Sequence, residues 1–181
     1  MPKGLIYVID DVRGEYPALK SYLRAAGYEV EVAVGARDVN VNYDVDISAV
    51  EDVAALANSY DLYAIAGGYK IYYFVTGKRP PTKRVDLAID TQKLEALTRS
   101  FKAAGKPIIA PLAAPAYLAK LGLLANLKAT VYPVTDLIQI LREGGAKFTN
   151  NAVERDGGII TVKDVAKISQ KDFLQAIREG A

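Results

Sequence analysis

The chain has 181 residues, 51% of them hydrophobic and 24% charged, and a formal net charge of +2. This balance gives no long-range attraction to nucleic acid or to an anionic membrane, and no apolar run is long enough to cross a bilayer. The length suits one domain, 1–181, with a sizeable core. An apolar run follows the first few residues directly, so we expect no signal peptide and a cytoplasmic location.

Cysteine and histidine, two residue types central to common catalytic sites, are missing from the chain. Thiol nucleophiles, Ser-His-Asp triads, disulfides and cysteine- or histidine-based metal sites are therefore excluded within it. Proton transfer near neutral pH would fall to carboxylates, lysines or tyrosines, and we expect no cofactor and no bound metal. The single methionine and the lack of cysteine also suit a heat-adapted (thermophile) source.

In chain order, short apolar runs alternate with segments of helical periodicity, which indicates right-handed crossovers and a mostly parallel sheet. Residues 39–46 alternate between polar and apolar and could form an edge strand or an extended arm. The other predicted strands lie at 5–9, 28–34, 61–66, 108–110 and 128–132, with a hairpin at 153–162, and the predicted helices lie at 15–26, 49–57, 92–104, from 115 onward, 134–142 and 170–178.

Residues 69–90 interrupt this alternation, because they are too many for an ordinary strand-to-helix loop. Residues 69–75 are aromatic and β-prone, and 76–84 are basic and proline-rich. We interpret 69–90 as an insertion whose tyrosines belong to the core or to a subunit interface, or else line a pocket. The basic run is expected to be a solvated loop.

Residues 106–122 read as a buried strand that passes through a sharp turn into a helix. Pro115 suits the first turn of that helix, where its missing N–H costs nothing. Such a junction is where α/β enzymes display a nucleophile. Here its apex carries Leu112 and Ala113, so the frame of an active site is predicted without the reactive group.

Two further motifs follow predicted strands. Asp10-Asp11 resembles the acidic pair that holds magnesium in response-regulator receiver domains, but such a site also needs an aspartate at the end of the third strand, where this chain has Gly67-Gly68. The acidic pair is therefore interpreted as a strand end or a helix cap. The glycines could let a ligand approach the backbone, form an oxyanion hole, or only permit a turn.

The order of these motifs, from Leu5 to Asp164, resembles the ThiJ/PfpI superfamily. The matching segments are Asp61 to Gly68, Gly105 to Ala110, Pro115 to Leu124, and Lys128 to Pro133. The resemblance implies a class I glutamine-amidotransferase-like, flavodoxin-like fold, a three-layer α/β/α sandwich. It also implies that the Gly67-Gly68 amides form an oxyanion hole, and that Glu15, twelve residues before Gly27, is the acidic partner of the nucleophile.

The departure from the family lies at the sharp turn. Where the family has Cys, usually His, then Gly and Pro, this chain has Leu112, Ala113, Ala114 and Pro115. Leucine has no nucleophilic atom, and Glu15 lacks the thiol that it would bind. The cysteine-dependent protease, glyoxalase, deglycase, hydratase and glutaminase activities known among relatives are therefore not expected.

Two functions remain open. The first is a non-catalytic pseudoenzyme, a small-molecule-binding, regulatory or oligomeric scaffold protein, with Tyr72 as a further wall of its cleft. The second is a hydrolase, lyase or glyoxalase-like enzyme with altered chemistry, in which Glu15 is a general base. The resemblance implies a homo-oligomer, and a partner chain could supply missing groups. The predicted cleft consists of Asp10, Glu15, Gly67, Gly68, Tyr69, Leu112 and Ala113.

Overall fold

A seven-stranded sheet forms the centre of the protein. The computed structural model describes residues 1–9, 15–35, 41–66, 69–78 and 90–178. Neighbouring strands of the sheet are parallel, except that β8 runs antiparallel to β9 at one edge. In spatial order the strands are β3 (Val45–Asp46), β2 (Glu29–Val34), β1 (Lys3–Val8), β4 (Leu62–Ala66), β5 (Ile108–Pro111), β9 (Ile159–Val162) and β8 (Val153–Asp156).

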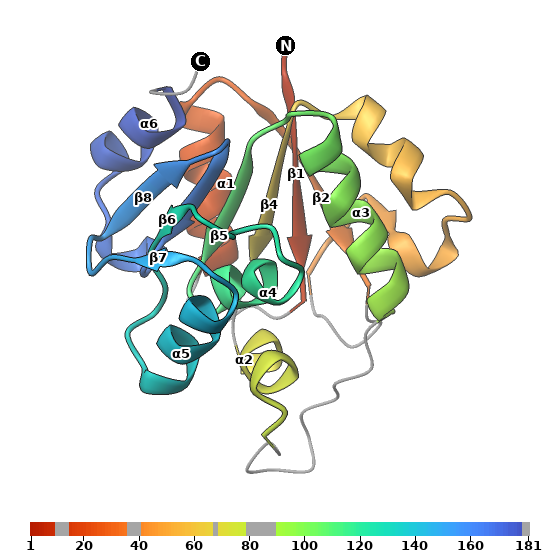
Figure 1. Ribbon diagram of the computed structural model, residues 1–181. Helices are drawn as coiled ribbons and strands as arrows, with labels where there is room; N and C mark the ends of the chain where they lie inside the picture. The colour runs from red at the N-terminus through yellow and green to blue at the C-terminus, as the bar shows by residue number, and fades with distance from the viewer. Residues whose placement is uncertain (10–14, 36–40, 67–68, 79–89, 179–181) are drawn as a thin grey trace.

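Helices cover both faces of this sheet, so the fold is the expected three-layer α/β/α sandwich (Figure 1). Alternate residues of β1 point to opposite faces: Ile6 and Val8 pack toward α1 (Glu15–Ala25) and α6 (Gln170–Arg178). Leu5 and Tyr7 belong to the larger core on the other face. That core includes buried residues of α2 (Tyr69–Thr76), α3 (Thr91–Ala103), α4 (Ala114–Lys120) and α5 (Thr135–Glu143).

Local sequence signals set several element ends as predicted. The helix α1 is followed by Gly27 at a φ of 96°, a left-handed conformation that glycine adopts without strain. Ser169 caps α6, because its hydroxyl accepts a hydrogen bond from the Asp172 N–H at 3.1 Å. The predicted hairpin is formed by β8 and β9, but Asp156 pairs with Ile159, so the turn lies at Gly157-Gly158 rather than at Asp156-Gly157. Both loop glycines have positive φ, as a type I′ turn requires.

The aromatic segment adopts a conformation that differs from the one its local propensity favours. Residues 69–76 form the helix α2, although Tyr, Phe, Ile and Val favour strands. Ile71 and Val75 lie one helical turn apart and are both fully or almost fully buried. The packing of this apolar stripe against α4 and α5 decides the conformation. Residues 79–89, the rest of the predicted insertion, lie outside the described part of the chain.

Three other elements are shorter or different from prediction. Of the segment 39–46, predicted as an edge strand or an extended arm, residues 39–40 lie outside the described part of the chain, and Val45–Asp46 (β3) is the strand found in 41–46. The predicted 49–57 helix is replaced by two 3-10 helices, Ile47–Ala49 and Val53–Ser59. The predicted 128–132 strand is only β6 (Lys128–Ala129), which pairs with β7 (Lys147–Phe148) in a separate two-stranded sheet. Among the described residues, no helix has the length and hydropathy needed to span a membrane.

Candidate functional site

The turn between β5 and α4 has a strained backbone at Leu112, whose φ is 55°. A leucine in this left-handed region costs roughly 1–2 kcal/mol, because its Cβ crowds the following carbonyl. Two hydrogen bonds fix the residue: its N–H donates to the Val162 carbonyl, and its carbonyl accepts from the Tyr132 N–H, both at 3.0 Å. The junction is therefore a rigid elbow held by segments far apart in the sequence.

The side chains at this elbow are apolar. Leu112 is half-buried, and Ala113, which is 4% exposed, precedes α4 and gives it no side-chain cap. Pro115 lies in the first turn of α4, as predicted. The elbow thus has the backbone geometry of a nucleophile-bearing turn, but neither apex side chain can attack a substrate or transfer a proton.

Glu15 is the first residue of α1, and it is 2% exposed. A carboxylate suits this position, because the first turn of a helix carries a partial positive charge. The helix α1 follows β1, and β1 lies next to β4, which lies next to β5. Since these strands are parallel, the segments that follow them, including Glu15 and Leu112, emerge at the same edge of the sheet. We call this edge the carboxyl edge.

The other predicted cleft residues fall on parts of the chain that the structure does not describe. Asp10, Gly67 and Gly68 lie outside the described residues. Tyr69 begins α2, and its side chain is likewise outside the description. Of the predicted cleft residues, the structure therefore describes the side chains of Glu15, Leu112 and Ala113.

Tyr72, predicted as a further wall of the cleft, contacts α5 through its hydroxyl. Its hydroxyl donates to Asp136 Oδ2 at 3.0 Å, and Lys78 Nζ donates to the same oxygen. These two donors lower the pKa of Asp136, and the hydrogen bond to Asp136 raises the pKa of Lys78. Tyr72 thus anchors α2 to the first turn of α5.

Sequence reasoning missed two residues at the carboxyl edge. Tyr132 donates its N–H to Leu112, and Lys70, in the first turn of α2, is only 8% exposed. A lysine within an aromatic run carries no motif that would single it out. The Tyr132 contact depends on how the segment after β6 passes the elbow, which no spacing rule predicts.

A group of buried tyrosines lies on the α3–α4 side of the sheet. Tyr63 donates to or accepts from the Thr98 hydroxyl at 3.1 Å, and its ring stacks on Phe101 with centroids 4.7 Å apart. Burial raises the pKa values of Tyr63, Tyr7 and Tyr117 above the usual range of tyrosine. These phenols therefore stay protonated at neutral pH and contribute to the core rather than to acid–base chemistry.

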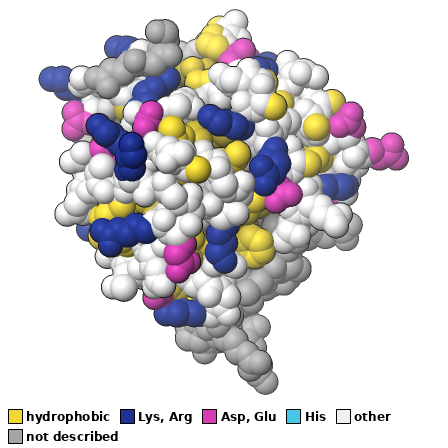
Figure 2. Space-filling model, in the orientation of Figure 1, with side chains coloured by type: hydrophobic (Ala, Val, Ile, Leu, Met, Phe, Trp, Pro, Cys, Tyr) yellow, Lys and Arg dark blue, Asp and Glu magenta, His cyan; other side chains and the backbone are white. Residues whose placement is uncertain are grey.

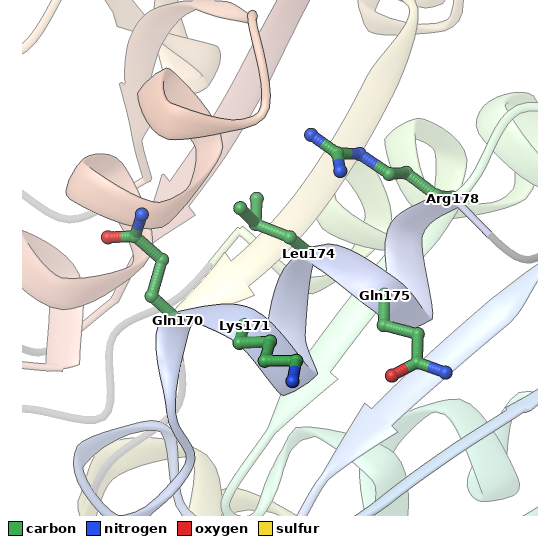
Figure 3. Close-up of a pocket in the computed structure, with 5 residues that line it drawn as sticks. All are labelled: Gln170, Lys171, Leu174, Gln175 and Arg178. Atoms are coloured by element: carbon green, nitrogen blue, oxygen red, sulfur yellow. The ribbon is translucent and has the colours of Figure 1, made fainter.

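A separate hollow lies along α6. The hollow has a volume of about 570 Å³, and the described residues that line it all belong to α6 and do not include Glu15, Leu112 or Ala113 (Figure 3). On the face in Figure 2, basic and acidic side chains are interspersed. Within the described ranges, no group of three or more acidic side chains could hold a metal ion. The hollow is lined by Gln170, Lys171, Leu174, Gln175 and Arg178.

Comparison with known proteins agrees with this geometry. The model of the DJ-1/PfpI family matches residues 5–179, nearly the whole chain. The chain belongs to the DJ-1/PfpI family. An uncharacterized protein of Methanocaldococcus jannaschii is 36% identical over 90 residues. That match covers 49% of this chain and 44% of the relative, so the chain spans less than half of the relative's length.

Solved structures of DJ-1/PfpI proteins share the fold over almost the whole chain. A ThiJ/PfpI domain protein from Brachyspira murdochii has a TM-score of 0.72 at 20% identity, covering 98% of this chain and 95% of its own. Oxidized Toxoplasma gondii DJ-1 has a TM-score of 0.72 at 26% identity, covering 99% and 90%. Drosophila melanogaster DJ-1beta has a TM-score of 0.69 at 22% identity, covering 99% and 97%.

Proposed function

We propose that this DJ-1/PfpI family member is non-catalytic and binds a small molecule at the elbow. One observation carries the proposal: Leu112 occupies the strained apex, held by hydrogen bonds from both sides, in a chain without cysteine or histidine. Glycine would adopt the same φ at almost no cost. A leucine that is kept there at roughly 1–2 kcal/mol points to a use for its side chain, and strained residues commonly lie where ligands bind.

The chemistry around the elbow favours a ligand that is mostly apolar and carries few polar groups. Leu112 and Ala113 would form an apolar floor, and Glu15 is a buried charged group at the same carboxyl edge. Small-molecule sites typically combine apolar walls with a few such polar groups, which fix the orientation of the ligand. A regulatory or carrier role agrees with binding that makes no covalent bond.

The burial of Glu15 also favours a second candidate, an enzyme in which this carboxylate is a general base. A turnover screen with dicarbonyls, peptides and glutamine separates the two. The proposal expects no turnover. Turnover that is lost in Glu15→Gln and kept in Asp61→Asn would contradict it. Asp61 is a matched control, because its carboxylate accepts from the Lys3 N–H at the opposite edge of the sheet and asparagine can still accept.

Binding itself is tested with a fragment library, by ligand-observed NMR of the full chain. We expect fragments that bind the wild type and are lost in Leu112→Trp, which fills the space above the elbow. They should be kept in Leu174→Trp, which places the same side chain in the hollow on α6. Equal loss or equal retention in the two variants would contradict an elbow site. The oligomeric scaffold role remains a proposal, which light scattering of the full chain tests.

A further inference from the structure

Residues 128–132 lie against the sheet face that carries the larger core, to which Ala129 and Val131 belong. Every second residue of this segment donates its N–H to the β8–β9 hairpin or to the elbow. The three bonds join Lys128 to Asp156 Oδ2 at 2.9 Å, Thr130 to Thr161 Oγ1 at 2.9 Å, and Tyr132 to the Leu112 carbonyl at 3.0 Å. The segment therefore connects the hairpin to the elbow.

Thr130, in the middle of this segment, has a hydroxyl group whose hydrogen bonding is incomplete. The residue is 0% exposed, and its Oγ1 has no hydrogen-bond partner among the residues that the structure describes. Thr98 is equally buried, but its hydroxyl donates to the Leu94 carbonyl at 2.8 Å. A buried hydroxyl without a partner is costly, so the large majority of such groups bind a protein atom or an ordered water molecule.

Two further polar groups lie beside Thr130. Thr161 accepts the Thr130 N–H through its hydroxyl oxygen, and a hydroxyl that accepts one bond still has a proton to donate. Glu154 is directly opposite Thr161 in the β8–β9 ladder, so the two side chains lie on the same face of the sheet. Its Oε1 accepts from the Thr149 hydroxyl at 2.9 Å, and the Thr149 N–H donates to Ala129, the residue before Thr130.

We propose that the hydroxyls of Thr130 and Thr161 bind one ordered water molecule, which donates a hydrogen bond to the Glu154 carboxylate. The two hydroxyls supply protons that the water oxygen accepts, and three hydrogen bonds are the usual number for a buried water. An anion would also accept these protons, but the negative charge of Glu154 disfavours one at this place. The inference is independent of the proposed function, because it needs no ligand at the elbow.

The water site has a consequence for the elbow. Thr130 is two residues before Tyr132, whose N–H holds the Leu112 carbonyl. A water that fixes the Thr130 side chain to the hairpin therefore also restrains the segment that restrains the elbow.

High-resolution crystal structures of the wild type and of Thr130→Val test the inference. Valine has nearly the shape of threonine and lacks the hydroxyl. We expect a water within hydrogen-bonding distance of both threonine hydroxyls in the wild type and none at this place in Thr130→Val. Thr130→Ser, which keeps the hydroxyl, should keep the water. A wild type in which the Thr130 hydroxyl binds a protein atom, or in which an ion takes the place of the water, would overturn the inference.

Chemical unfolding gives a second readout that needs no crystals. Removing a hydroxyl that binds water loses a hydrogen bond, whereas removing an unpartnered buried hydroxyl relieves its cost. We therefore expect Thr130→Val to lower the denaturation midpoint, as the matched variant Thr98→Val should, because the Thr98 hydroxyl has protein partners. A midpoint that is unchanged or raised in Thr130→Val while it falls in Thr98→Val would overturn the inference.

Discussion

Replacing Gly35 by alanine should be one of the most destabilising changes of a single methyl group in this protein. Gly35 follows β2, and a Cβ there would lie 2.3 Å from Tyr7 Oη and 3.1 Å from Tyr7 Cζ. The Tyr7 side chain is fully buried, and its strand is hydrogen-bonded on both sides, so the ring cannot move away. Overpacking of this kind costs about 1–3 kcal/mol, and we expect the upper end.

A double-mutant cycle isolates the contact that causes the loss. Tyr7→Phe removes the oxygen that clashes first and leaves the ring carbon at 3.1 Å as the nearest atom, so Gly35→Ala should then cost only about 1 kcal/mol. Tyr7→Phe alone should be neutral or stabilising by up to about 1 kcal/mol. The reason is that the buried hydroxyl has no hydrogen-bond partner among the residues that the structure describes.

Guanidinium chloride unfolding of the four proteins, followed by circular dichroism, measures this coupling of about 2 kcal/mol. Gly4→Ala is the control, because a Cβ at Gly4 meets its nearest atom, Leu62 Cδ2, at an ordinary 3.5 Å. Additive effects of Gly35→Ala and Tyr7→Phe would refute the assignment of the clash to the hydroxyl. If Gly4→Ala were as unstable as Gly35→Ala, the available space around the added Cβ could not be what determines the loss of stability.

Three further predictions concern the elbow, the alkaline limit and the anchor of α2. Leu112→Val should lower the free energy of unfolding by about 1–2 kcal/mol more than Leu121→Val does, as measured by chemical unfolding. A β-branched residue is poorly tolerated at the φ of 55° at position 112, whereas it is well tolerated at the φ of −78° at position 121. Equal losses in the two variants would argue against a strained elbow. Burial and the nearby Glu31 raise the pKa of Tyr60 to about 12, so the folded state keeps this proton to higher pH than the unfolded chain does. The free energy of unfolding should therefore fall as pH rises above about 10, and Tyr60→Phe should make this fall less steep in alkaline denaturation. An unchanged slope in Tyr60→Phe would contradict the assignment to Tyr60. Asp136→Asn should speed amide hydrogen exchange in α2 but not in α3, because it weakens the contact between Tyr72 and α5. The wild type should show the same change as pH falls below the lowered pKa of Asp136. Equal protection of α2 in the variant and the wild type would refute the role of Asp136 in anchoring α2.

The sheet could be predicted from sequence because its strands are short apolar runs between clear punctuation. Gly27, the glycines of the hairpin and Ser169 acted locally, so their effects were visible in the pattern. The aromatic run of α2 could not be assigned in this way. Its β propensity is overridden by packing of Ile71 and Val75 against helices that lie far along the chain.

The site was predictable where it depends on the turn and not where it depends on tertiary contacts. The strand, the apex and Pro115 placed the elbow, and the structure adds the positive φ of Leu112. Nothing in the sequence indicated that Lys70 would be buried or that Tyr132 would bind the elbow through its backbone. Both follow from how α2 and the segment after β6 cross the carboxyl edge.

The two hydrogen bonds of Leu112 also say when during folding the elbow can exist. Its N–H donates to the carbonyl of Val162 in the last strand, and its carbonyl accepts from the Tyr132 N–H, so a nascent chain that has not yet emerged as far as β9 lacks the first of these restraints. Closing such distant contacts is slow, because the loop entropy is lost before the contact energy is gained. The fully restrained elbow is thus acquired only at the final assembly of the sheet, and any fragment ending before β9 is expected to lack it.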